Sequence, residues 1–164
     1  MKIINHLAVN FIILAAGLSL VTGCGRKTTP PTGASDAGHP HEHHAPHGGT
    51  PVVLGDEAFH LEFVRDGTAG KMAAYMLDGE LENFIRIPAS EFVVVATISG
   101  APQTLTFHAV PNPATGETVG DTSLFETQAD WLKTTAEFDA VLSSITLRGS
   151  TFQDVKFNFP KGNE

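Results

Sequence analysis

The chain has 164 residues, of which 41% are hydrophobic and 17% charged, and 18 acidic against 10 basic side chains give a formal net charge of −8. This length fits a single domain. The acidic balance excludes a nucleic-acid-binding protein, because phosphate binding needs a basic surface. A single cysteine excludes both an internal disulfide and a cysteine-based zinc site.

Residues 1–23 have the pattern of an export signal. Lys2 supplies the positive start, and an apolar segment follows from Leu7 to Val21. That segment has the length of a signal-peptide core and is short for a membrane-spanning helix. We therefore expect residues 1–23 to be removed from the mature protein.

The signal ends in Leu20-Val21-Thr22-Gly23-Cys24, which resembles the lipobox of bacterial lipoproteins. The resemblance implies cleavage after Gly23 and acylation of Cys24, and several acyl chains on one residue anchor a protein stably. Gly25 is not the aspartate that retains many such lipoproteins at the inner membrane. The resemblance therefore implies a lipid anchor in the cell envelope, on the periplasmic face of the outer membrane if the cell has one. The alternative is an ordinary secretory signal followed by a chance cysteine.

Residues 24–46 are expected to be a disordered tether rich in histidine and proline. Beyond Cys24 this segment contains no large apolar residue, so it has nothing with which to build a core. A flexible tether of this length would lift the following domain clear of the lipid headgroups.

Residues 47–164 change to short segments of alternating hydrophobicity, separated by turn signals such as Ser99-Gly100 and Arg148-Gly149. This pattern predicts an all-β domain, specifically an antiparallel, immunoglobulin-like β-sandwich with one short helix. A change of parity between Phe152 and Val155 indicates a bulge. The predicted strands are 58–63, 71–77, 83–87, 92–98, 103–109, 135–141, 144–147 and 154–159.

The predicted helix covers residues 123–132. Ser123-Leu124-Phe125-Glu126 has the form of a capping box, and the apolar positions that follow, Ala129 and Leu132, fit one helical face. The preceding loop, 111–121, reads as a long connection that delivers this helix. A calcium-binding loop is the alternative, because the segment is rich in threonine, glycine and aspartate.

Five of the eight histidines lie within nine residues, at His39, His41, His43, His44 and His47. Neutral imidazole is a common protein ligand for copper and zinc, and spaced histidines on a flexible chain can wrap one ion. The run therefore predicts a transition-metal site whose affinity falls below about pH 6, where imidazole becomes protonated. The alternative is a solvated linker with no ligand.

Two further candidate ligands, His60 and Glu62, lie two residues apart on a predicted strand and so share one face. With His47 nearby, beside the Gly48-Gly49 turn, they could form a His/His/Glu site on the sheet. The alternative is an exposed polar strand face. His108 also points outward on its strand and reads as a surface residue.

The segments His47-Gly48-Gly49, Gly55-Asp56 and His60-Leu61-Glu62 carry a second resemblance. They are similar to small bacterial β-domains that occur as exported proteins and beside the periplasmic adaptor subunits of heavy-metal efflux systems. The resemblance covers about residues 47–80 and implies a metal-efflux or envelope partner, with no activity attached.

No nucleophile elbow, dinucleotide fingerprint or phosphate-binding loop is present in the sequence. We therefore expect a non-enzymatic protein, without catalytic residues or an obligatory cofactor, that binds or buffers copper or zinc. The main alternative is a cell-envelope interaction module whose histidine run is an inert spacer. An unrecognised hydrolase is a more distant one. Several acids are expected to form a solvated surface: Asp121, Glu126, Asp130, Glu137 and Asp139.

Overall fold

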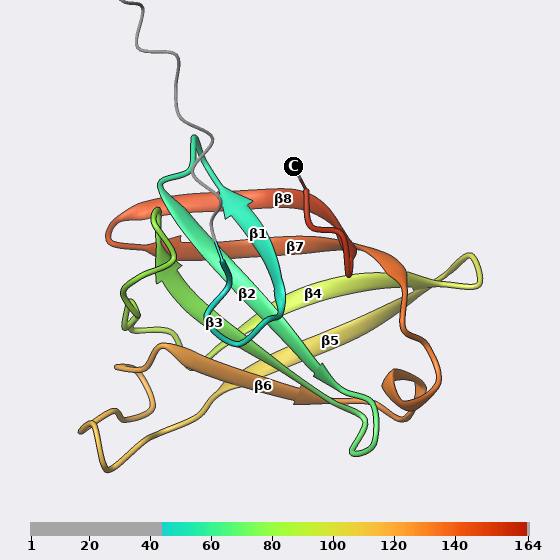
Figure 1. Ribbon diagram of the computed structural model, residues 1–164, viewed down its shortest axis with the longest axis horizontal. Helices are drawn as coiled ribbons and strands as arrows, with labels where there is room; N and C mark the ends of the chain where they lie inside the picture. The colour runs from blue at the N-terminus through green and yellow to red at the C-terminus, as the bar shows by residue number, and fades with distance from the viewer. Residues whose placement is uncertain (1–43, 164) are drawn as a thin grey trace, which may run out of the picture. The chain divides into compact units, whose positions relative to one another are not determined.

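The computed structural model describes residues 44–163, which form eight antiparallel strands and one short 3-10 helix (Figure 1). The export signal, Cys24, His39, His41 and His43 lie outside the described residues. The elements are β1 (Thr50–Leu54), β2 (Phe59–Asp66), β3 (Lys71–Asp78), β4 (Glu91–Ile98), β5 (Ala101–Ala109), β6 (Leu124–Gln128), η1 (Asp130–Lys133), β7 (Phe138–Leu147) and β8 (Ser150–Phe159).

The eight strands belong to one antiparallel sheet, in the order β1-β2-β3-β6-β5-β4-β7-β8. The sheet curls nearly into a barrel, so that β1 and β8, at its two ends, lie near each other (Figure 1). The prediction of an antiparallel all-β domain is confirmed. The immunoglobulin-like arrangement of two packed sheets is not confirmed, because the strand pairing is continuous from β1 to β8.

The C-terminal tail closes the barrel along the free edge of β1. The Val53 backbone N–H donates to Asn163 Oδ1 (2.8 Å), and Asn163 Nδ2 donates to the Val53 carbonyl (3.1 Å). The Thr50 hydroxyl donates to the Pro160 carbonyl (3.2 Å). The side chain of Asn163 therefore forms with Val53 the two hydrogen bonds that a neighbouring strand would form, and it satisfies backbone groups that a sheet edge leaves open.

The core follows from the alternation of side chains along each strand. Phe63 of β2 stacks on Phe157 of β8 with 5.0 Å between ring centroids, and it meets Phe107 of β5 edge-on at 5.5 Å. Phe107 in turn stacks on Phe92 of β4 at 4.8 Å. Because these rings come from four strands, they join opposite walls of the barrel across its interior.

The predicted change of parity near Phe152 is present in β7 as well as in β8. Buried positions pass from Leu142 to Ile145 along β7, and Asp154 has a φ of 52° in β8. The β4–β7 register shifts between Val93 and Val94, so the irregularity in β7 also affects its pairing with β4. The inward face therefore changes parity at the same level in two neighbouring strands.

The helix predicted over residues 123–132 is wrong. Residues 124–128 form β6, in which Phe125 and Thr127 point inward and Phe125 lies opposite Ala74 of β3. Ser123, the expected cap, donates instead to Glu117 Oε1 (2.7 Å). Of the predicted helix, only the short 3-10 helix η1 is present. The sequence Leu-Phe-Glu-Thr-Gln also fits a period of two, and pairing with β3 outweighs the local capping preference.

Other element boundaries differ from the prediction. The segment 83–87 forms isolated bridges, Leu77 with Phe84 and Ile87 with Thr122, instead of a strand. The predicted strands 135–141 and 144–147 form the single strand β7. The turns at Ser99-Gly100 and Arg148-Gly149 are confirmed, and all four residues have the positive φ that tight hairpins of this kind require.

Replacing Gly162 by alanine is expected to destabilise the domain because it disturbs the contact by which the C-terminal tail closes the barrel against β1. A Cβ at Gly162 would lie 2.6 Å from the Pro51 carbonyl oxygen, in addition to the strain of a φ of 84°. Gly149 is a matched control, since its φ is 88° and a Cβ there meets nothing within 4 Å. Gly149→Ala should cost about 1–2 kcal/mol of unfolding free energy from the backbone alone. Gly162→Ala should cost clearly more in urea unfolding, and equal costs would contradict the closure.

Candidate functional site

The first ordered feature of the described chain is a tight turn, Ala45–Gly48, that lies against the outside of β2. The Gly48 N–H donates to the Ala45 carbonyl (2.9 Å), and Gly48 has a φ of 66°. At Gly49 a Cβ would lie 2.6 Å from the Phe63 carbonyl oxygen and 2.7 Å from Val64 Cγ2. Glycine is therefore required there, because the backbone passes directly over β2.

A buried carboxylate holds this turn in place. The Glu62 side chain is fully buried, and its Oε1 accepts hydrogen bonds from the backbone N–H groups of His47 and Gly49, both at 2.8 Å. Its Oε2 lies 2.7 Å from Nδ1 of His47. Burying a carboxylate is costly unless hydrogen bonds replace its water. Both carboxylate oxygens of Glu62 are bonded, and every donor comes from the His47-Gly48-Gly49 turn.

The imidazole of His47 is fixed in orientation as well as in position. Its ring stacks on Tyr75 with centroids 3.7 Å apart and planes 14° from parallel, and Phe84 packs at an angle with centroids 5.7 Å away. Tyr75 reaches this place because it lies opposite Glu62 in the β2–β3 register. Burial, and then the negative charges of Glu62 and Glu126, raise the pKa of Tyr75 above 10.0, so the phenol stays protonated at neutral pH.

This contact also decides which ring nitrogen of His47 remains for a ligand. An ionised carboxylate can only accept hydrogen bonds, so the Nδ1 that faces Glu62 carries the proton. The lone pair of the neutral ring is then on Nε2, on the side of the ring away from Glu62. The His47 side chain is 33% exposed. A histidine whose other nitrogen donates to a carboxylate is the usual form of a metal-ligating histidine in proteins.

The structure brings together only part of the predicted His/His/Glu site. His47 and Glu62 are in contact, and His60 shares the face of β2 with Glu62, as expected. His60 is 1% exposed, however, and its Nδ1 lies 3.2 Å from the Asp78 carbonyl. Because both are buried, the alternative of an exposed polar face does not hold for His60 and Glu62. Within residues 44–163, no three His, Cys, Asp or Glu side chains form a group that could hold a metal ion.

The structure also places two other histidines considered in the sequence, His44 and His108. His44 is exposed three residues before His47, at the point where the described chain begins. His108 is a surface residue, as predicted, with a side chain that is 67% exposed and 3.4 Å from Glu91.

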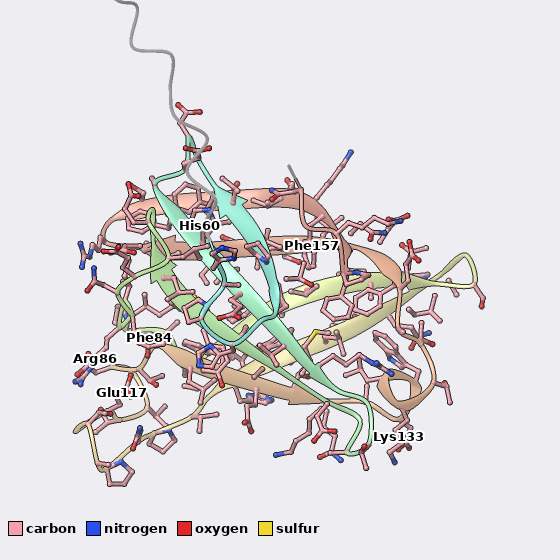
Figure 2. The ribbon with its side chains drawn as sticks, viewed as in Figure 1. His60, Phe84, Arg86, Glu117, Lys133 and Phe157 are labelled. Atoms are coloured by element: carbon pink, nitrogen blue, oxygen red, sulfur yellow. The ribbon has the colours of Figure 1, made fainter. Side chains whose placement is uncertain are left out.

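A second polar cluster lies beside His47 and was not expected from the sequence. Glu117, only 8% exposed, accepts hydrogen bonds from the backbone and hydroxyl of Ser123 (3.0 and 2.7 Å) and from the Thr115 hydroxyl (2.7 Å). Arg86 Nε lies 3.8 Å from Glu117, and Arg86 Nη2 donates to the Thr115 carbonyl (2.6 Å). Figure 2 shows Phe84, Arg86 and Glu117 together at one end of the domain. These bonds hold the loop 111–121 against Arg86 and Ser123.

The shallow pocket between the two clusters has a volume of about 230 Å³. Its wall on one side is formed by the rings of His47, Tyr75 and Phe84, and Leu124 also lines it. Phe84 is 49% exposed, which is unusual for a large apolar side chain in this domain. Sequence reasoning missed Tyr75 and Phe84. The alternation in β3 could place Tyr75 outward, but only the strand register puts it under His47.

No protein-family model, curated protein or solved structure matches this chain. No helix within residues 44–163 is both long and apolar enough to cross a membrane. The function must therefore be inferred from the site itself.

Replacing Glu117 by glutamine is expected to weaken the pH dependence of stability in acid. Burial raises the pKa of Glu117, but hydrogen bonds from Thr115 and Ser123 and the charge of Arg86 together lower it below 4.5. The stabilisation from this carboxylate is therefore complete above pH 4.5 and is lost as the pH falls through the lower, folded-state pKa. In urea titrations below this pH, the unfolding free energy of the wild type should fall more steeply than that of Glu117→Gln. Parallel curves would contradict this prediction.

Proposed function

We propose that this chain is a lipid-anchored protein of the cell envelope that binds or buffers copper or zinc, with His47 as the fixed ligand and the histidines before it as the further ligands. The role is binding and not catalysis. The observation that carries the proposal is the 2.7 Å contact between His47 Nδ1 and the buried carboxylate of Glu62.

This contact favours metal ligation for two physical reasons. It keeps the proton on Nδ1 and so leaves Nε2 as a lone-pair donor, and it fixes the orientation of the imidazole. Stacking on Tyr75 holds the ring plane. Less conformational entropy is lost when an already oriented ligand binds an ion, so a fixed first ligand strengthens an otherwise adaptable site.

One histidine is too few to hold an ion, and the sequence supplies others close by. His44 is three residues away, and His39, His41 and His43 precede it. Three or four imidazoles would complete a tetrahedral or tetragonal set for Zn²⁺ or Cu²⁺. A run of this kind has to become ordered on binding, which makes a site adaptable between metals.

The anchoring part of the proposal rests on the sequence around Cys24. A lipid on Cys24 would leave about twenty residues of tether before the His47 turn. The metal site would then lie where the tether meets the domain. This position suits the capture of ions close to a membrane-bound transporter, in agreement with the resemblance of residues 47–80 to domains found near efflux adaptors.

Replacing His47 by asparagine is expected to remove the tightest metal-binding step. In calorimetric titrations of the full chain with Zn²⁺ and with Cu²⁺ at about pH 7.5, we expect the wild type to bind with micromolar or lower Kd. Glu62→Gln should weaken binding about 10–100-fold, the usual effect of losing a carboxylate behind a metal-ligating histidine. His108→Asn is the matched control, since His108 lies on the surface of β5. The metal affinity of this variant should equal that of the wild type.

Further arms of the same titration separate the alternatives. Replacing His39, His41, His43 and His44 together by asparagine should abolish tight metal binding. In the wild type, metal affinity should fall steeply between pH 7.5 and 5 because imidazole must be neutral to bind. Unchanged metal affinity in His47→Asn would contradict the role of His47 as the fixed ligand. No heat from the wild type with either ion would contradict metal binding and favour the envelope interaction module.

A further inference from the structure

Within residues 44–163, the side of β5 that faces β6 has no partner strand along most of its length. On one side β5 pairs with β4 from Ala101 to His108. On the other side it pairs with β6 only at His108 and Ala109. Figure 1 shows β5 diverging from β6 toward the β4–β5 hairpin. Among the described strands, none pairs with residues 101–107 on that side.

The hydrogen bonds at the end of β5 show which backbone groups face this open edge. The Ala109 N–H donates toward β4, to the Ser90 carbonyl (2.9 Å), whereas the Val110 N–H donates toward β6, to the Leu124 carbonyl (2.9 Å). Backbone groups alternate between the two sides of an antiparallel strand. The N–H and C=O groups of Thr104 and Thr106 therefore point to the open side.

The edge is rigid and is bordered by a groove. Leu105 and Phe107 are buried in the core, and the hairpin turn at Ser99-Gly100 ties β5 to β4. The groove between β5 and the end of β6 has a volume of about 610 Å³. Thr104, Thr106, Thr127 and Gln128 are among its lining residues. An edge that is already in strand conformation loses little entropy when another strand pairs with it.

We propose that this edge binds an extended, uncharged peptide segment of a partner protein by β-strand addition. In this mode, backbone hydrogen bonds supply affinity and side-chain subsites supply specificity. Lys71 and Glu126, the two charged side chains that line the groove, lie within ion-pair distance of each other, and His108 lies beside Glu91, which is outside the groove. Lys71 Nζ lies 3.3 Å from Glu126, and His108 Nδ1 lies 3.4 Å from Glu91. The other lining residues are uncharged, either hydroxyl- or amide-bearing (the threonines and Gln128) or aliphatic (Ala109 and Val110), which favours a peptide without charged side chains.

A second copy of this chain fits the same edge less well. Antiparallel self-pairing about Thr104 would place Pro102 opposite Thr106 of the other copy. Pro102 has no N–H, so each copy would lose one hydrogen bond of a short ladder. A separate peptide can end before Pro102 and pair only with Thr104 and Thr106. This inference is independent of metal binding.

The test compares two substitutions at one edge position. Thr104→Pro removes the N–H that faces the groove, and proline is tolerated on an edge strand when its N–H side is open. Thr104→Ala changes the side chain and keeps the N–H. Thermal unfolding should show that both variants remain folded. The probe is a phage-displayed library of random nine-residue peptides, selected on the immobilised full chain.

Selected peptides should be rich in uncharged β-branched residues, bind Thr104→Ala within about twofold of the wild type, and bind Thr104→Pro at least tenfold more weakly. In the NMR spectrum, the amide protons of Thr104 and Thr106 should exchange more slowly when such a peptide is bound. Peptides that bind both variants equally, selection of charged sequences, or no selection at all would overturn the proposal. A dimer in sedimentation that Thr104→Pro abolishes would assign the edge to a second copy and overturn it as well.

Discussion

Glu62 places a carboxylate on the outer face of β2 where no water reaches it, and the organisation of the site depends on how that charge is satisfied. Its partners are the two backbone N–H groups and the imidazole of the His47-Gly48-Gly49 turn. Without them, a buried, unpaired charge would destabilise the domain by several kcal/mol. The same three bonds that satisfy Glu62 dock the beginning of the domain and set the orientation of His47. One buried side chain therefore both docks the turn and orients the imidazole.

The barrel supplies the rest of the site through register. Pairing of β2 with β3 puts Tyr75 directly across from Glu62, so that its ring supports the imidazole. The tail that contains Asn163 covers the free edge of β1, the strand that lies on the other side of Glu62. In contrast, the edge of β5 is left open and rigid. The proposed ion site and the proposed peptide-binding edge therefore use different strands of the domain.

Much of the fold could be predicted from alternation and turn residues, because the inward positions of strands such as 58–63 and 103–109 are local properties of the sequence. The strand 124–128 could not, since its capping-box pattern favours a helix and only pairing with β3 decides against it. For the site, the sequence indicated that His47 could join His60 and Glu62, because His60 and Glu62 share one face of a strand and His47 lies beside a nearby Gly-Gly turn. It did not indicate that Glu62 is buried, or that Tyr75 and Phe84 flank the ring, because burial and register depend on segments distant in the chain.

The central claim is that Glu62 holds the proton of His47 on Nδ1 so that Nε2 can bind a metal ion. Proton–nitrogen correlation spectra of the imidazole side chains, recorded on the full chain with and without Zn²⁺, test this most directly. We expect His47 to be protonated on Nδ1 in the metal-free protein, and its Nε2 resonance to shift on addition of Zn²⁺ while Nδ1 keeps its proton. A His47 ring that is protonated on Nε2, or one whose resonances do not move when Zn²⁺ binds, would contradict the account.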